Sequence, residues 1–303
     1  MKVVVTGGRG FLGTPLVEVL RRDGHDVAVL TRGTAPARGE VQWTPAASRP
    51  DNWVRAFEGT GAVVNLAGEP IAEGRWTASR KRAIASSRVE ATRGVVRALR
   101  ETAARGVVLL SGSAVGVYGA HRDEPLDESS PPGSDFLASV CREWEAEAQA
   151  ASAHARVVLL RTGFVVAREG GALPRLALPF HVFAGGPLGS GRQVMSWIHR
   201  NDWIAMVRWA IATAAVQGPL NLTAPAPVTN REMAAALGRA LRRPSFVPTP
   251  AFALRLALGE MADALILSGQ RVLPRVALDN GFTFRHERID GALADIYRLN
   301  ART

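Results

Sequence analysis

A glycine-rich segment near the start of the chain has the composition of a phosphate-binding loop. In VVVTGGRGFLGTPLVEVL, Gly7, Gly10 and Gly13 stand between a run of valines and a helical pattern. The first glycine would permit a tight turn, the second a close approach of the backbone to a pyrophosphate, and the third close packing of helix on strand. The start of the helix would add N–H donors and a positive dipole end. This segment predicts a dinucleotide-binding site.

The residues at the end of the second apolar run, 26–31, distinguish an NAD site from an NADP site. NAD sites usually carry an acidic residue there, which accepts hydrogen bonds from the ribose hydroxyls. This chain has Thr31 and Arg32 instead. A guanidinium cannot accept those hydrogen bonds, but it suits a 2′-phosphate. Arg9, within the glycine loop, could flank the same phosphate, so we expect NADP in preference to NAD. The alternative for Arg32 is a solvated loop arginine.

A folded sheet must hold these residues in place, and the chain up to about residue 163 has the sequence pattern of alternating strands and helices. Near-continuous apolar runs cover 2–7, 26–31, 62–68, 106–113 and 155–163. Such runs are typical of strands buried on both faces of a parallel sheet. Helical patterns at 14–24, 78–106 and 135–149 alternate with them. The alternation predicts an α/β fold, a Rossmann-like doubly wound parallel sheet.

The alternation of apolar runs with helical patterns ends after Gly163. Residues 170–193 contain scattered Gly and Pro and are expected to be rich in loops, whereas 229–244 has capping-box spacing and predicts a helix. Residues 251–267 predict an amphipathic helix against the core or a second subunit, which leaves a homodimer open. We expect a dinucleotide-binding domain at 1–165 with a return segment at about 194–225. A smaller substrate-side portion would comprise 166–193 and 226–303.

Composition excludes several classes of protein. The chain has 303 residues and a formal charge of +10, but its arginines are scattered among acidic residues, so we expect no nucleic-acid partner. A single cysteine rules out an internal disulfide framework and suits a reducing, cytoplasmic setting. No signal peptide and no long uninterrupted apolar run are visible, so we expect no membrane partner. The histidines lack metal-ligand spacing, so we expect no metal.

Longer strings of sequence point to one family. NLAG (65–68), LLSGSAVGVYG (109–119) and SWIHRNDW (196–203) resemble motifs of the extended short-chain dehydrogenase/reductases. The strings DFLASVCREWE, GGPLGSGRQVMSWIH and NLTAPAPVTNRE resemble an atypical, NAD(P)-dependent epimerase-like subgroup with an extra C-terminal domain of unknown function. This similarity extends from residue 1 to about 285.

The resemblance implies which residues border the cofactor. Segment 65–68 would lie under the adenine and ribose, and the Arg161-Thr162 segment would border the nicotinamide. The full set of expected cofactor-binding residues is Gly7, Arg9, Gly10, Phe11, Leu12, Gly13, Thr31, Arg32, Leu66, Ala67, Gly68, Arg88, Ser111, Arg161 and Thr162.

The same resemblance exposes a gap in the catalytic machinery. Family members use a Tyr-x-x-x-Lys pair for proton transfer, and this chain has none. Aligning Glu145 with the glutamate that often follows the motif puts Leu137 in the tyrosine position and Cys141 in the lysine position. Three candidates for proton transfer remain. Ser113 occupies the place of the family serine, Tyr118 follows it, and Cys141 carries the only thiol.

Each candidate has a plainer alternative. A serine is a poor acid without help, and a tyrosine in this motif is usually a loop-packing residue. A buried cysteine is more often a small apolar filler than a nucleophile. Arg88 could instead supply the missing lysine's positive charge at the ribose, or bind an anionic substrate group. The alternative for Arg88 is a solvated helix arginine.

Two functions follow from these residues. The first is an NADP-dependent oxidoreductase or epimerase-like enzyme acting on an unidentified small molecule. The second is a catalytically weak or inactive NADPH-binding sensor or scaffold. The missing Tyr and Lys favour the second function, and the intact Ser113 strand and return motif favour the first.

Overall fold

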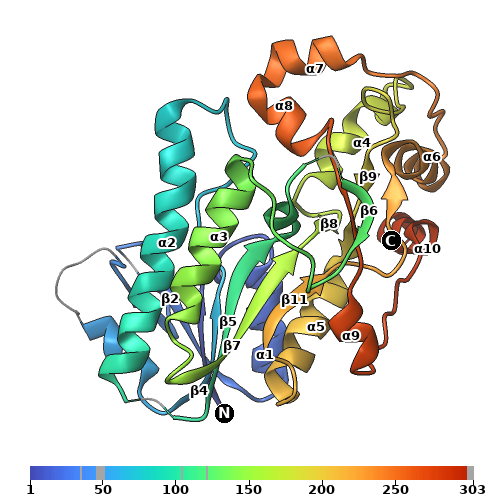
Figure 1. Cartoon of the computed structure of the whole chain (residues 1–303). Coiled ribbons are helices and arrows are strands. Elements are labelled where there is room, and N and C mark those ends of the chain that lie inside the picture. Colours follow the sequence, from blue (N-terminus) through green and yellow to red (C-terminus); the bar gives the residue numbers. More distant parts are fainter. Residues whose placement is uncertain (35, 46–51, 104, 121, 299–303) are drawn as a thin grey trace.

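A seven-stranded parallel sheet forms the centre of the protein (Figure 1). The computed structural model describes residues 1–34, 36–45, 52–103, 105–120 and 122–298. The strands lie in the order β11-β7-β5-β4-β1-β2-β3, and every neighbouring pair is parallel. Their bounds are β1 Lys2–Thr6, β2 Asp26–Thr31, β3 Glu40–Gln42, β4 Thr60–Asn65, β5 Val107–Ala114, β7 Ala155–Thr162 and β11 Gly218–Leu222. This is the predicted doubly wound, Rossmann-like sheet.

Helices cover both faces of the sheet. On one face lie α1 (Gly13–Arg22) and α5 (Arg200–Ala212); on the other lie α2 (Ala78–Glu101), α3 (Phe136–Gln149) and the 3-10 helix η1 (Asn52–Phe57). Successive strand residues face opposite sides, so Val3 and Val5 pack under α1 while Val4 packs under α2. Burial of both strand faces explains why these segments are almost wholly apolar.

The second part of the chain builds a smaller layer beside the carboxyl ends of the strands (Figure 1). A separate core joins α4, α6 and α10 through residues such as Phe180, Leu237 and Leu293. Its helices are α4 Leu173–His181, α6 Asn230–Leu241, α7 Ala251–Leu258, α8 Glu260–Leu265, α9 Arg275–Asp279 and α10 Ile289–Arg298. Short strand pairs tie the layer together: β8 (Phe164–Val166) with β10 (Trp197–His199), β9 (Val194–Met195) with β12 (Val228–Thr229), and β6 (Arg122–Leu126) with β13 (Gln270–Val272). The predicted division into two domains stays a prediction.

One local prediction about this part was incomplete and another was wrong. The segment expected to be rich in loops, 170–193, also contains α4, because a proline within its first turn is compatible with a helix start. The single amphipathic helix expected over 251–267 is broken into α7 and α8 at Gly259, whose φ of +63° a helix cannot accommodate. The predicted capping box of α6, between Thr229 and Glu232, is confirmed. Within the described residues, no helix combines the length and apolar character needed to cross a membrane.

Candidate functional site

The glycine loop between β1 and α1 has the backbone shape that a pyrophosphate requires. Gly7 has a φ of +66°, and a Cβ there would lie 2.7 Å from the Leu66 carbonyl oxygen. A Cβ on Gly13 would lie 2.1 Å from the Gly7 carbonyl oxygen, so any larger residue would push α1 away from the loop. The Gly10 N–H closes the turn by donating to the Gly7 carbonyl at 2.9 Å. The loop and the start of α1 therefore fit a dinucleotide phosphate.

The loop after β4 is held beside the glycine loop by buried hydrogen bonds. The Thr6 hydroxyl accepts from the N–H groups of Leu66 and Ala67 at 3.1 and 3.2 Å, and donates to Asn65 Oδ1 at 2.7 Å. Asn65 in turn donates to the Ser111 hydroxyl at 3.4 Å. Ser111 is fully buried, so its hydroxyl holds the Asn65 side chain in place and does not face the site. The backbone of 65–68 is thereby fixed at the carboxyl edge of the sheet.

The two arginines expected near a 2′-phosphate both lie at the end of β2. Arg9 Nε donates to Glu40 at 2.9 Å, and Arg32 Nη2 lies 3.2 Å from Glu69. The hydrogen bond from Arg9 lowers the pKa of the Glu40 carboxyl to about 2. Both guanidinium groups are largely exposed, and Arg9 Nη1 approaches Gly33, just after the strand. They place two exposed guanidinium groups, each paired with a carboxylate, at the edge where the cofactor's adenosine end would lie.

Ser113 belongs to a buried ion-pair network and not to an open reaction site. Its hydroxyl donates to Glu145 Oε1 at 2.6 Å. The Glu145 carboxylate is also bound on both oxygens by Arg161, at 2.9 and 2.8 Å. All three residues are at least nine-tenths buried. The serine proton therefore points at a carboxylate that is held in place by a bidentate arginine.

Tyr118 completes the same network and is fully buried. Its hydroxyl donates to Asn221 Oδ1 at 2.7 Å and accepts from Arg161 Nη1 at 2.9 Å. Burial raises the pKa of Tyr118 to about 12, despite the neighbouring arginine. A phenol with both hydrogen-bonding roles occupied and a raised pKa is suited to packing and not to proton transfer.

Helix α3 places Leu137 and Cys141 in apolar surroundings. Leu137 packs against an apolar cluster that contains Trp76, just before α2, and Met261 of α8, so the position that a tyrosine would occupy has apolar neighbours. Cys141 is 4% exposed, and its burial, together with the nearby Glu145, raises the pKa of its thiol to about 11. Such a cysteine stays a protonated thiol at neutral pH.

Arg88 brings a positive charge to this end of the site. Its side chain extends over Gly68, where a Cβ would approach the guanidinium carbon to 3.3 Å. The guanidinium lies 5.3 Å from the centre of the Trp144 ring and donates to the Ile84 carbonyl at 2.8 Å. Burial lowers the pKa of Arg88, while the nearby Cys141 raises it. A half-buried cation thus stands between the cofactor loop and the position where the family's lysine would lie.

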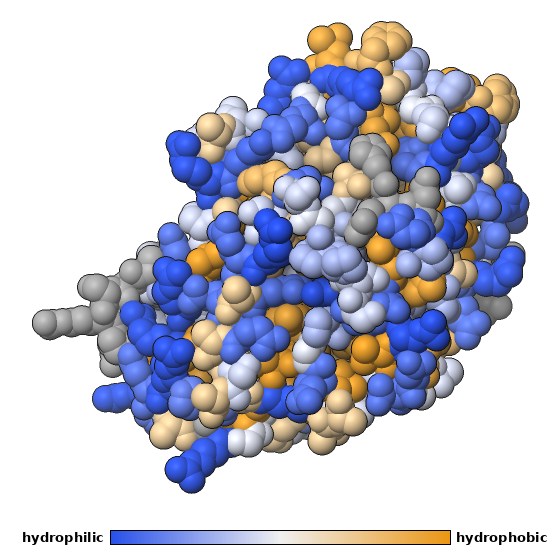
Figure 2. Space-filling view, in the orientation of Figure 1, coloured by the Kyte–Doolittle hydropathy of each residue, from blue (hydrophilic) through white to orange (hydrophobic). Residues whose placement is uncertain are grey.

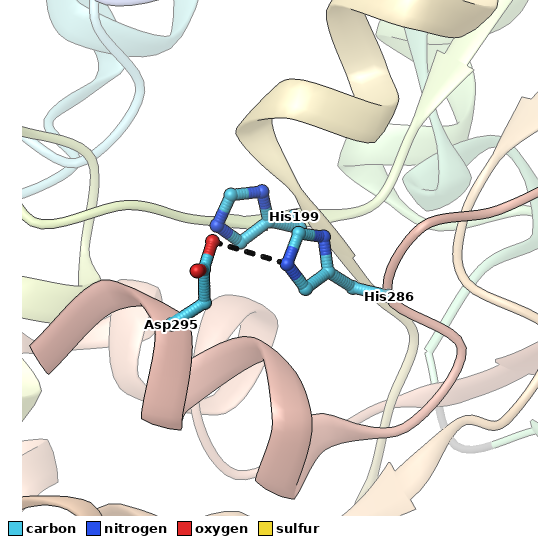
Figure 3. A group of neighbouring side chains, drawn as sticks. All are labelled: His199, His286 and Asp295. Atoms are coloured by element: carbon cyan, nitrogen blue, oxygen red, sulfur yellow. Dashed lines mark hydrogen bonds and ion pairs between the residues drawn. The ribbon is translucent and has the colours of Figure 1, made fainter. Parts of the chain in front are cut away.

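One group of side chains in the described part of the chain has the composition of a metal site: His199, His286 and Asp295 (Figure 3). The two rings stack with centroids 4.0 Å apart, and His286 Nε2 lies 3.2 Å from Asp295 Oδ2. However, His199 Nδ1 accepts the backbone N–H of Asn201 at 3.1 Å. The neutral ring then carries its proton on Nε2, the nitrogen left for a metal. This hydrogen bond argues against metal binding, and the absence of a metal stays a prediction.

The predicted residues therefore separate into two groups. The glycine loop, segment 66–68, Arg9, Arg32 and Arg88 lie along the carboxyl edge of the sheet. Phe11 packs its ring on Gly170 and Gly171, Leu12 precedes α1, Thr31 is buried at the end of β2, and the Thr162 hydroxyl accepts from Trp203. Ser113, Tyr118, Cys141 and Arg161 instead belong to the buried network or line it.

Sequence reasoning did not anticipate Asn221 or the ion pair of Glu145 with Arg161. A glutamate on the otherwise apolar face of α3, beside Ala138, Cys141 and Ala148, could have indicated a buried partner. Its partner could not be chosen from among so many arginines.

Comparisons with known proteins agree with this geometry. Residues 3–222 match the NAD dependent epimerase/dehydratase family, and residues 249–296 match a domain of unknown function, DUF1731. The chain is 44% identical to the epimerase family protein SDR39U1 homolog, chloroplastic, of Arabidopsis thaliana, over 98% of this chain and 86% of that protein. It is 39% identical to the epimerase family protein YfhF of Bacillus subtilis, over 98% of both chains.

A solved structure is similar over the whole chain. The crystal structure of human epimerase family protein SDR39U1 (isoform 2) with NADPH has a TM-score of 0.89 and 33% identity, and covers 98% of this chain and 99% of that one. The resemblance drawn from the sequence motifs is thereby confirmed. The chain belongs to the NAD dependent epimerase/dehydratase family and carries the DUF1731 domain at its C-terminal end.

Proposed function

We propose that this protein binds NADPH along the carboxyl edge of its parallel sheet. The observation that carries the proposal is the glycine loop, whose packing leaves no room for a Cβ on Gly7 or Gly13. The helix N-terminus behind it favours negative charge. The human relative at 33% identity was solved with NADPH, which supports the same cofactor for this chain.

Arg9 and Arg32 would select the phosphorylated cofactor. Strand β2 ends in Thr31, directly before Arg32, and has no carboxylate at that end to bind a free ribose 2′-hydroxyl. The carboxylates that these arginines now contact, Glu40 and Glu69, are partly exposed, and the guanidinium groups are more exposed still, so a phosphate dianion can share them. We therefore expect NADPH to bind more tightly than NADH.

The proton-transfer groups favour a binding role over ordinary epimerase chemistry. NADPH, when bound, supplies a hydride from its nicotinamide ring. The chain must then supply or remove a proton at the substrate oxygen. Ser113 donates to Glu145, Tyr118 is buried between two partners, and Leu137 stands in an apolar cluster. We conclude that the protein is best described as an NADPH-binding member of its family that lacks the Tyr-Lys relay.

A second function is favoured by Arg88. Its guanidinium is half-buried beside Gly68 and Cys141, and the one hydrogen bond it makes within the described residues is to the Ile84 carbonyl. A cation so placed can bind the ribose or stabilise negative charge on the oxygen of a small carbonyl substrate. The protein would then reduce that substrate with the proton taken from water.

The single buried thiol supports a reducing compartment, which we propose to be the cytoplasm.

Fluorescence titration with NADPH and NADH tests the cofactor site. Gly10→Ala is the informative variant, because its Cβ would make one tight contact with the protein, at 3.1 Å from the Gly7 carbonyl oxygen, less severe than those at Gly7 and Gly13, and would stand where the pyrophosphate must approach. We expect wild-type protein to bind NADPH, and Gly10→Ala to lose at least tenfold in affinity with little change in melting temperature. Equal NADPH affinity of the two proteins would contradict the proposed site.

A panel of carbonyl compounds, scored by NADPH consumption, separates the two functions. Tight NADPH binding without turnover supports the binding role, and turnover that Arg88→Gln abolishes supports the reductase. Arg82→Gln, an exposed arginine on the same helix, is the matched control. If Arg88→Gln changes neither NADPH affinity nor turnover, the role proposed for Arg88 is wrong.

A further inference from the structure

Seven exposed apolar residues lie on two segments of the C-terminal part, 178–183 and 246–256. Each of these residues is at least 59% exposed, apart from Val247 at 38%. Figure 2 shows apolar surface along the top edge of the molecule, where Figure 1 places α7. We call this set the apolar rim; it comprises Leu178, Val182, Phe183, Phe246, Val247, Phe252 and Leu256.

Backbone hydrogen bonds join the two segments into one surface. The Val247 N–H donates to the Gly185 carbonyl at 3.1 Å, and the Thr249 N–H donates to the Pro187 carbonyl at 2.9 Å. The chain that follows α4 therefore runs beside the chain that enters α7.

Helix α7 shows how little of the rim the protein covers. Its sequence, AFALRLAL, contains a single polar residue, yet none of its eight residues is buried. Phe252 and Leu256 are four residues apart and lie on one face of the helix. A contiguous apolar surface of this kind on a folded protein usually marks a partner or a membrane contact.

Positive charge borders the rim. Residues 170–201 and 233–259, which contain it, hold seven arginines and neither Asp nor Glu. Three of these arginines pair with carboxylates from elsewhere: Arg200 with Glu169, Arg239 with Asp290 and Arg255 with Asp263.

Two exposed arginines stand directly beside the rim. No ion pair is seen for Arg242 or Arg243 within the described residues, and the Arg243 guanidinium lies 4.6 Å from the centre of the Phe183 ring. A second copy docked on the same face would bring arginine against arginine. An anionic surface would instead complement both the charge and the apolar side chains.

We propose that the apolar rim docks on a lipid bilayer that contains anionic headgroups. Phe246, Phe252 and Leu256 would enter the interface, and Arg242 and Arg243 would contact lipid phosphates. Docking of this kind needs no membrane-spanning helix. It departs from the expectation that the protein has no membrane partner, which came from searching the sequence for a span.

Vesicle co-sedimentation of the full chain tests the proposal. The probes are phosphatidylcholine vesicles and vesicles of phosphatidylcholine and phosphatidylglycerol in a 3:1 ratio, at low and high salt. We expect binding to the mixed vesicles that weakens with salt. The double variant Phe246→Ser, Phe252→Ser should lose at least tenfold. Arg242→Gln with Arg243→Gln should lose roughly 30-fold, as about 1 kcal/mol per basic residue implies.

Two control variants make the outcome decisive. Leu278→Ser removes an exposed apolar residue outside the rim, and Arg22→Gln removes an exposed charge from the last turn of α1, at the opposite end of the sheet; both variants should bind vesicles like wild type. Circular dichroism and melting temperature establish that each variant is folded. The proposal is overturned if the wild-type protein does not bind the mixed vesicles, or if the rim variants bind these vesicles as well as the control variants do. A rim-dependent dimer in sedimentation velocity without vesicle binding would also overturn it, in favour of a second copy.

Discussion

The buried pair of Glu145 and Arg161 yields the sharpest prediction about stability. Glu145→Gln keeps the shape of the side chain and removes its charge. The Arg161 guanidinium would then remain buried without a counter-charge, and Ser113 would lose a carboxylate acceptor at 2.6 Å. Removing one partner of a buried ion pair costs about 3 to 5 kcal/mol, far more than the pair contributes relative to two apolar residues.

The size of the expected shift in melting temperature follows from the chain length. An unfolding entropy of about 2.1 cal/mol/K per residue gives about 0.6 kcal/mol/K for a chain of 303 residues. A loss of 3 to 5 kcal/mol therefore lowers the melting temperature by about 5 to 8 °C. Thermal unfolding followed by circular dichroism measures this directly.

A neighbouring residue provides a matched control. Glu147, two positions along the same helix, pairs with Arg93 at 2.9 Å, and the Arg93 side chain is 63% exposed. Glu147→Gln should cost less than about 1 kcal/mol, because solvent screens an exposed pair. The double variant Glu145→Leu, Arg161→Met should recover part of the loss, since it leaves no buried charge. If Glu145→Gln melts no lower than Glu147→Gln, leaving the buried Arg161 guanidinium without its counter-charge does not destabilise the fold, and the reasoning is refuted.

Three further predictions follow from buried groups. Burial lowers the pKa of His199 from 6.5 to about 4, so the stability it contributes is present above pH 6.5 and is lost as the pH falls towards 4. This change amounts to about 3 kcal/mol, and melting curves of His199→Asn, which keeps the helix cap, should lack it. Gly13→Ala places a Cβ 2.1 Å from the Gly7 carbonyl oxygen, so it should lower both melting temperature and NADPH affinity. Gly291→Ala, with open space around it, should lower neither. Cys141 should react with Ellman's reagent at pH 8 only after unfolding, because its pKa is about 11 and it is 4% exposed; rapid reaction of the folded protein would contradict this.

Much of the fold could be predicted because its determinants are local. Apolar runs and turn glycines lie within a few residues of each other, and they placed β1, β2, β5 and β7 to within about two residues. The same applied to α3 and to the capping box of α6. Predictions were less accurate where composition misled, as at α4, which lies in the segment 170–193 whose Gly and Pro content indicated loops.

The sequence alone determined the cofactor loop and the missing catalytic pair. Glycines at 7, 10 and 13 between a strand and a helix predict the loop, and neither of the two tyrosines, Tyr118 and Tyr297, has a lysine four residues later. Both statements depend on residue identity and short spacing, which no tertiary contact can change.

Only the tertiary structure decided what the remaining polar residues do. Along the chain, Ser113 and Tyr118 look like catalytic candidates and Arg161 looks like a cofactor contact, yet Glu145 and Asn221 bind them from 16 to 103 residues away. Burial then sets the pKa of Tyr118 and Cys141, and burial depends on which helices pack above them. A proton-transfer role requires a free hydrogen-bonding site and a suitable pKa, and both are properties of the folded surroundings.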